Sequence, residues 1–152
     1  MKLAEALAWR AAIQTRATQL RDRIKQNVLI QEGDQPAEDP RALLAELDQI
    51  LTELVGLITA INRTNLATTL PSAMTLTEAL ARRDVLHMRH GIIATIADTA
   101  STLLERYSLR EIRRVATVDV GALRREMDDL AQQRRELDGS IQAVNWTTEL
   151  IE

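Results

Sequence analysis

The sequence has no cysteine and no phenylalanine, and its aromatic residues are two tryptophans and one tyrosine. Without cysteine there are no disulfides, no thiolate zinc sites and no cysteine nucleophiles. Proteins that bind single strands without sequence preference stack bases on aromatic side chains, which are scarce here. The net charge of -3 also argues against binding nucleic acid by charge alone. We therefore expect no nucleic-acid partner.

Long apolar runs are also missing. The best candidate for a membrane span starts at Leu43, but it contains Glu46, Asp48 and Glu53, so it cannot cross a bilayer alone. The first ten residues contain Glu5 and lack the apolar core of a signal peptide. We expect a cytoplasmic protein, and these features disfavour a membrane partner.

Leucine and alanine supply 43 of the 152 residues, whereas glycine and proline are scarce. This composition favours helices throughout the chain. Apolar spacing predicts helices over 2–30, 41–62, about 77–107, and from 119 to at least 144. Asp39, Thr77 and Asp119 are the expected N-caps, and residues near 113–118 have β character. The predicted fold is all-α, a long antiparallel four-helix bundle with a possible short β segment at 113–118.

Two halves of the chain resemble each other. Residues 2–16 align without gaps on residues 75–89 with seven identities, LLAELDQI from Leu43 matches LRREMDDL from Leu123, and INRTN from Ile61 matches VNWTT from Val144 after a three-residue shift. Chance similarity between simple helices is the alternative. We interpret the chain as one helical domain, 1–152, built from a duplicated hairpin, with repeats at about 1–70 and 74–152.

In an antiparallel bundle the start of helix 1, the end of helix 2, the start of helix 3 and the end of helix 4 share one pole. Arginine forks, orienting asparagine amides and tryptophan walls there would suit a small anionic or amide-bearing ligand. In the structural alternative, the arginines pair with glutamates and the asparagines cap helix ends. The candidate ligand-binding residues are Glu5, Trp9, Arg10, Asn62, Arg63, Glu78, Arg83, Asn145 and Trp146.

Catalytic and metal-binding signatures are weak. Asp84, His87 and His90 share a helix face, but Arg83 and Arg89 beside them repel a cation. The sequence has no glycine-rich phosphate loop and no nucleophile elbow. We expect no metal and no cofactor, we assign no catalytic residue, and we favour a protein that is not an enzyme.

The segments QEGDQPAEDP, INRTN, LTEALARRD, TVDV and NWTTEL occur in this order along the chain. Together they resemble a family of small bacterial proteins of unknown function that is sometimes labelled septicolysin. The resemblance covers nearly the whole chain, and its label implies a pore-forming toxin. It brings no catalytic or binding residues with it.

Helices 2 and 3 carry apolar stripes broader than an isolated bundle needs, which favours a homo-oligomer. We therefore expect a helical oligomerisation or binding protein. An enzyme or small-ligand site at the pole is the alternative, and a membrane-acting toxin is the third hypothesis.

Overall fold

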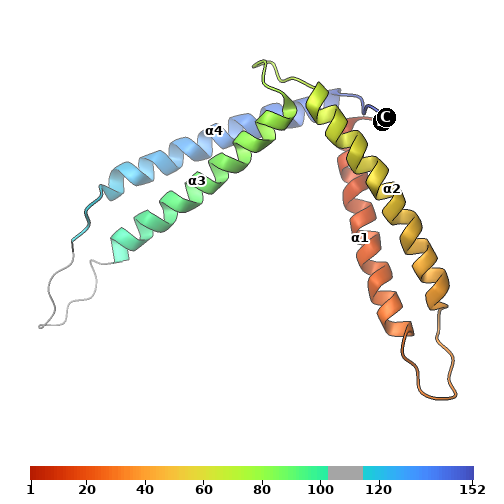
Figure 1. Ribbon diagram of the computed structural model, residues 1–152. Coiled ribbons are helices and arrows are strands. Elements are labelled where there is room, and N and C mark those ends of the chain that lie inside the picture. Colours follow the sequence, from red (N-terminus) through yellow and green to blue (C-terminus); the bar gives the residue numbers. More distant parts are fainter. Residues whose placement is uncertain (103–114) are drawn as a thin grey trace, which may run out of the picture. The chain divides into compact units, whose positions relative to one another are not determined.

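The computed structural model describes residues 1–102 and 115–152 and contains four long helices (Figure 1). They are α1 (Leu3–Asn27), α2 (Pro40–Ala67), α3 (Leu76–Thr102) and α4 (Val120–Thr147). No sheet occurs in the described part of the chain; one isolated bridge joins Lys2 to Glu149. The predicted all-α class with four helices is confirmed, and a four-helix bundle is consistent with these elements.

The expected β segment at 113–118 is wrong for its described part. Residues 115–118 form no strand and lead directly into the N-cap of α4, whereas 113 and 114 lie outside the described residues. β-Branched residues raise strand propensity, but a strand also needs a partner strand, and this segment has none within the described ranges. Tyr107, the expected end of helix 3, also lies outside those ranges.

Side-chain caps explain where the helices begin. Asp39 accepts a hydrogen bond from the backbone N–H of Arg41, and Asp119 accepts one from that of Ala122, each at 3.0 Å. These two caps agree with the prediction. The third helix is capped by Thr75 and not by Thr77, because Glu78 completes a capping box with Thr75.

The chain divides into two compact units, each described by itself. Unit 1 contains residues 1–69 and 143–152, and unit 2 contains residues 70–142. This boundary differs from the predicted repeats because residues 143–152 bond to the start of α1. Helices α1 and α2 form the hairpin of unit 1, and α3 with most of α4 forms that of unit 2 (Figure 1).

A single seam of side chains joins α1 to α2. Its buried centre is formed by Ile13, Leu20, Leu43 and Ile50, and five more apolar residues pack against it. These positions recur every three or four residues, so each helix presents one continuous stripe to its neighbour. Burying a side chain of this size contributes roughly 1.5–3 kcal/mol, which makes the seam the main source of hairpin stability.

Ion pairs set the register of both hairpins. Arg16 pairs with Glu46 at 2.6 Å across unit 1, and Arg23 pairs with Glu38 near the end of α1. In unit 2, Arg89 Nε donates to Glu126 at 3.0 Å. In unit 1 the paired arginines thus belong to α1, and their glutamates lie in α2 or just before it.

The two hairpins match residue by residue. Helices α1 and α3 begin 73 residues apart, at Leu3 and Leu76, and α2 and α4 both begin and end 80 residues apart. We call residues related by these separations equivalent; Arg16 and Glu46 are equivalent to Arg89 and Glu126. The three-residue shift inferred for INRTN and VNWTT is unnecessary, because Ile61 and its equivalent Ile141 are both buried.

The equivalent caps give a first prediction. Replacing Asp39 or Asp119 by alanine leaves backbone N–H groups without their acceptor, and each change should lower the free energy of unfolding by about 1 kcal/mol. Denaturant melts measure this loss. Asp128→Ala, at an exposed position of α4 away from its N-terminus, should change stability by less than half as much. Equal effects at all three positions would contradict the capping role.

Candidate functional site

The predicted pole is represented in unit 1 by the start of α1, the end of α2 and the segment after α4. We call this group, residues 1–5, 63–64 and 148–152, the terminal cluster. Lys2 Nζ lies 2.6 Å from a Glu149 oxygen, and the N–H of Leu150 donates to the Met1 carbonyl at 2.8 Å. The N–H of Ile151 donates to Thr64 Oγ1 at 2.9 Å. Most polar groups in the cluster therefore bind one another.

Arg63 belongs to the same arrangement, because its guanidinium donates to the backbone carbonyl of Glu152. Thr64 is fully buried, and its hydroxyl also donates to the Ala60 carbonyl at 2.8 Å. This hydroxyl serves as donor within α2 and acceptor from the C-terminal segment. The equivalents of Thr64 and Ile151 are Val144 and Pro71, which lack the hydroxyl and the N–H of this bond.

Glu5 and Glu78 act as helix caps. Glu5 Oε2 accepts from the Lys2 backbone N–H at 2.7 Å. Glu78 Oε2 accepts from both the N–H and the hydroxyl of Thr75 at 2.8 Å. The Thr75 N–H, with its hydroxyl second, holds the pKa of Glu78 below its usual value. Neither glutamate pairs with the arginine five residues later, so the predicted Glu–Arg pairs are absent from the described residues.

Arg10 and its equivalent Arg83 differ in their partners. Arg10 is half-buried and makes no hydrogen bond or ion pair with any part of the chain that the structure describes. Arg83 donates through Nε and a terminal nitrogen to one Asp84 oxygen, at 3.0 and 2.9 Å. Its Nε also lies 3.9 Å from an Asp138 carboxylate oxygen. Only the arginine of unit 2 is neutralised.

The tryptophans and asparagines are dispersed within unit 1. Trp9 donates from Nε1 to Glu53 at 2.8 Å and thereby bridges α1 and α2. Trp146 is 64% exposed, whereas Asn145 is buried. Asn62 is exposed and makes no hydrogen bond to any described residue. These side chains do not line a common cavity among those found in the described residues.

Asp84, His87 and His90 do not form a metal site. Asp84 is bound by Arg83, and Arg134 lies 2.9 Å from His87 Nδ1. Because an arginine side chain can only donate, His87 Nδ1 accepts from Arg134. The lone pair of this nitrogen is then not available to bind a cation. Within 1–102 and 115–152, no group of three histidine and carboxylate side chains is arranged to hold a metal ion.

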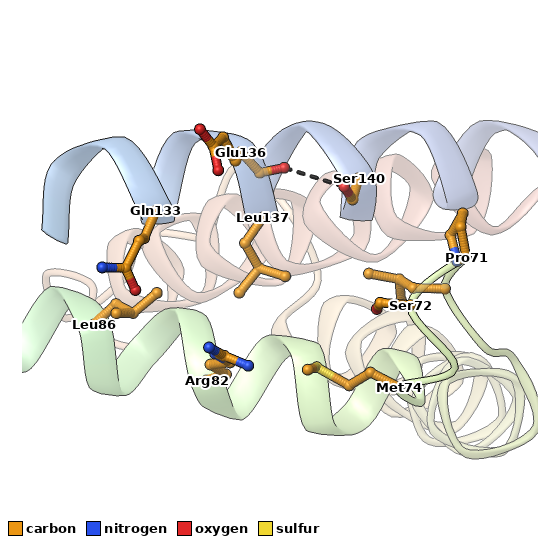
Figure 2. A pocket seen from close by; sticks show the side chains of 10 residues that line it. Pro71, Ser72, Met74, Arg82, Leu86, Gln133, Glu136, Leu137 and Ser140 are labelled. Atoms are coloured by element: carbon orange, nitrogen blue, oxygen red, sulfur yellow. Dashed lines mark hydrogen bonds between the residues drawn. The ribbon is translucent and has the colours of Figure 1, made fainter. Parts of the chain in front are cut away.

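Unit 2 contains a cavity of about 380 Å³ that the sequence did not indicate (Figure 2). Its lining residues come from the connection after α2 and from facing sides of α3 and α4: Leu70, Pro71, Ser72, Met74, Arg82, Leu86, Gln133, Glu136, Leu137 and Ser140. Arg82 forms no ion pair or hydrogen bond with the described residues. One sequence signal could have pointed to this cavity. The alignment of residues 2–16 on 75–89 places Arg82 opposite Trp9.

A second feature outside the predicted site is an apolar stripe on an exposed side of α3. Val85, Met88, Ile92 and Ile96 are between 43% and 65% exposed, and their spacing places them on one side of the helix. Their equivalents in α1 are Ala12, Thr15, Gln19 and Arg23. The same position is therefore apolar in one hairpin and mostly polar in the other.

Arg10→Met and Arg83→Met should have different effects on stability. Arg10 is half-buried without a partner, so a methionine that packs in the seam should raise the free energy of unfolding by about 0.5–2 kcal/mol. Arg83→Met breaks partly exposed pairs, and its effect should stay within about 1 kcal/mol. Denaturant melts compare the two variants, and a destabilised Arg10→Met protein would show that its guanidinium is compensated.

Acid should destabilise the protein through its capped and paired glutamates. Lys2 and then the Met1 amine hold the pKa of Glu149 below its usual value, Arg23 does so for Glu38, and Thr75 does so for Glu78. Folding lowers these pKa values, so their stabilisation is present above the unfolded value of about 4.3 and is lost as pH falls through the folded values. Thermal midpoints should drop below about pH 4.

Glu149→Gln provides the control for this acid effect. The variant should have a lower midpoint than the wild-type protein near neutral pH and a smaller further loss on acidification. Midpoints that remain constant down to about pH 2 would contradict the assignment.

Comparisons with known proteins show kinship without an activity. Residues 10–150 match the family described as "Family of unknown function (DUF6847)". A solved structure, titled as that of a functionally unknown conserved protein from Corynebacterium diphtheriae, is 42% identical with a TM-score of 0.92. The match covers 99% of each chain. No curated protein matches.

These findings bear on the family resemblance inferred from the sequence. Neither the family description nor the solved neighbour includes the septicolysin label, so only membership of a family of unknown function is supported. No helix among residues 1–102 and 115–152 is long and apolar enough to cross a membrane. The chain belongs to the DUF6847 family of unknown function.

Proposed function

We propose that the protein is a helical self-association module, in which the α3 stripe of one copy packs against that of a second copy. The exposed stripe is the observation that supports this proposal. Four large apolar side chains at helical spacing on a surface are costly in water, and such faces mark interaction sites. Helix α3 also contributes to the seam of unit 2, so it is apolar on two sides.

The comparison between hairpins strengthens the case. We infer that the hairpins are duplicated, because their caps, ion pairs and seams recur at equivalent positions. If this side of the helix only faced water, we would expect polar residues there in both hairpins. Instead, Gln19 and Thr15 in α1 correspond to Ile92 and Met88 in α3.

Charges beside the stripe favour a parallel pair. Asp84 precedes Val85 on one flank, and Arg89 lies on the opposite flank. In a parallel two-helix contact these flanks face each other, so Asp84 of one copy approaches Arg89 of the other, and each adds this contact to its pair with Arg83 or Glu126 within its own copy. An antiparallel contact would instead bring the Arg89 side chains of the two copies near each other, which is repulsive. The occupant that this pattern fits is a second copy with α3 in the same direction.

Sedimentation of matched lysine variants tests self-association. The wild-type protein should have a mass of at least two chains at micromolar concentration. Ile92→Lys places a charge in the contact on both copies and should raise the dissociation constant at least about a hundredfold. Gln19→Lys, at the equivalent position in α1, should leave the mass unchanged. A monomeric wild-type protein, or equal effects of both variants, would contradict the proposal.

Cross-linking distinguishes the direction of the contact, because the chain has no native cysteine. Met88→Cys should form a disulfide between copies in a parallel pair, whereas Thr15→Cys at the equivalent exposed position should not. Self-association without the Met88 disulfide would overturn parallel pairing. The exposed Leu51 and Val55 of α2 would then be the next candidate partners for the stripe.

The other two hypotheses have less support. In the terminal cluster the charged groups bind one another, which favours its structural role over a ligand site. A pore-forming role is supported neither by the comparisons nor by the described helices.

A further inference from the structure

We infer that the cavity beside Arg82 in unit 2 binds a small carboxylate with an apolar tail. This site is independent of the proposed self-association, because no residue of the α3 stripe lines it. Its volume of about 380 Å³ lies within the range of small-molecule sites.

The two hairpins differ at the equivalent positions. In unit 1 the indole of Trp9 bridges the two helices and donates to Glu53. The equivalents in unit 2 are Arg82 and Gln133, which make no hydrogen bond to each other. Both of these residues line the cavity between α3 and α4 (Figure 2).

The lining combines an apolar wall with the exposed, unpaired Arg82 and one carboxylate, that of Glu136. Leu70, Met74, Leu86 and Leu137 form the apolar part, and Arg82 extends between α3 and α4 beside them (Figure 2). A guanidinium with no protein partner has its forked donors available, and these donors match the two oxygens of a carboxylate.

A single unpaired guanidinium limits the ligand to a monoanion. The nearby Arg89 is bound to Glu126, and the Glu136 carboxylate of the lining accepts a hydrogen bond from Gln132. A phosphate dianion requires more positive charge than one guanidinium, whereas a carboxylate requires one partner. The apolar wall then binds a hydrocarbon tail.

The turn that closes one end of the cavity is strained. Ala73 has φ of 63°, in the left-handed region that a side chain disfavours, and it lies between Ser72 and Met74 of the lining. The N–H of Ala73 donates to the Leu70 carbonyl at 2.9 Å, which holds the turn. Strain of this kind is found at ligand sites, where it places lining residues.

Calorimetric titration with sodium octanoate tests the assignment, with acetate and octylamine as comparison probes. Octanoate should bind the wild-type protein saturably, acetate more weakly because it lacks the tail, and octylamine not at all because it carries the wrong charge. Arg82→Gln should weaken octanoate binding about tenfold or more. Arg135→Gln, an exposed arginine of α4 that does not line the cavity, should bind like the wild-type protein.

A double variant transfers the arrangement of unit 1 into unit 2. Arg82→Trp with Gln133→Glu should abolish octanoate binding while the thermal midpoint stays the same or rises, which separates loss of the site from loss of the fold. Ile92→Lys should retain binding, so this result is distinguishable from failure of self-association. Absence of saturable octanoate binding, or equal affinity in wild-type and Arg82→Gln proteins, would overturn the assignment.

Discussion

A helical hairpin buries only one stripe of each helix, and the rest of this structure depends on that constraint. In unit 1 the seam between α1 and α2 uses residues such as Ile13, Leu20 and Ile50. Every other face of the two helices must be polar or must find a further partner. An apolar residue outside the seam is therefore stronger evidence of an interaction surface in a hairpin than in a multilayered domain. The α3 stripe and the Arg82 cavity are the departures from this requirement in unit 2.

Because the two hairpins are equivalent, each departure in unit 2 can be compared with the matching position in unit 1. Positions with the same role in both hairpins, such as Glu5 and Glu78 or Arg16 and Arg89, serve the shared fold. Positions where the hairpins differ are not required by the shared fold. Trp9 against Arg82 is one such difference: Trp9 is bonded across unit 1, whereas Arg82 is unpaired and lines a cavity in unit 2.

Local signals allowed the fold to be predicted well. Asp39 and Asp119 were identifiable as caps because capping depends on neighbouring residues, and the seams followed from spacing. The predicted cap Thr77 is wrong because Thr75 and Thr77 both precede an apolar run, and only the reciprocal bond with Glu78 distinguishes them. The β character near 113–118 was misleading because a propensity cannot supply a partner strand.

The candidate site was harder to predict because residue type does not specify a partner. Glu5 and Arg10 are close in sequence, yet Glu5 binds the backbone of Lys2 and Arg10 binds no described side chain. Arginines near glutamates thus suggested pairs, whereas the backbone N–H groups at a helix start are the nearer and obligatory claimants for a carboxylate. Because the glutamates bind backbone N–H groups, the unpaired guanidinium groups are better candidates for ligand binding than the predicted Glu–Arg pairs. Arg10 lines none of the cavities found in the described residues, whereas the exposed Arg82 lines one, so the location of space decides which unpaired arginine can bind a ligand.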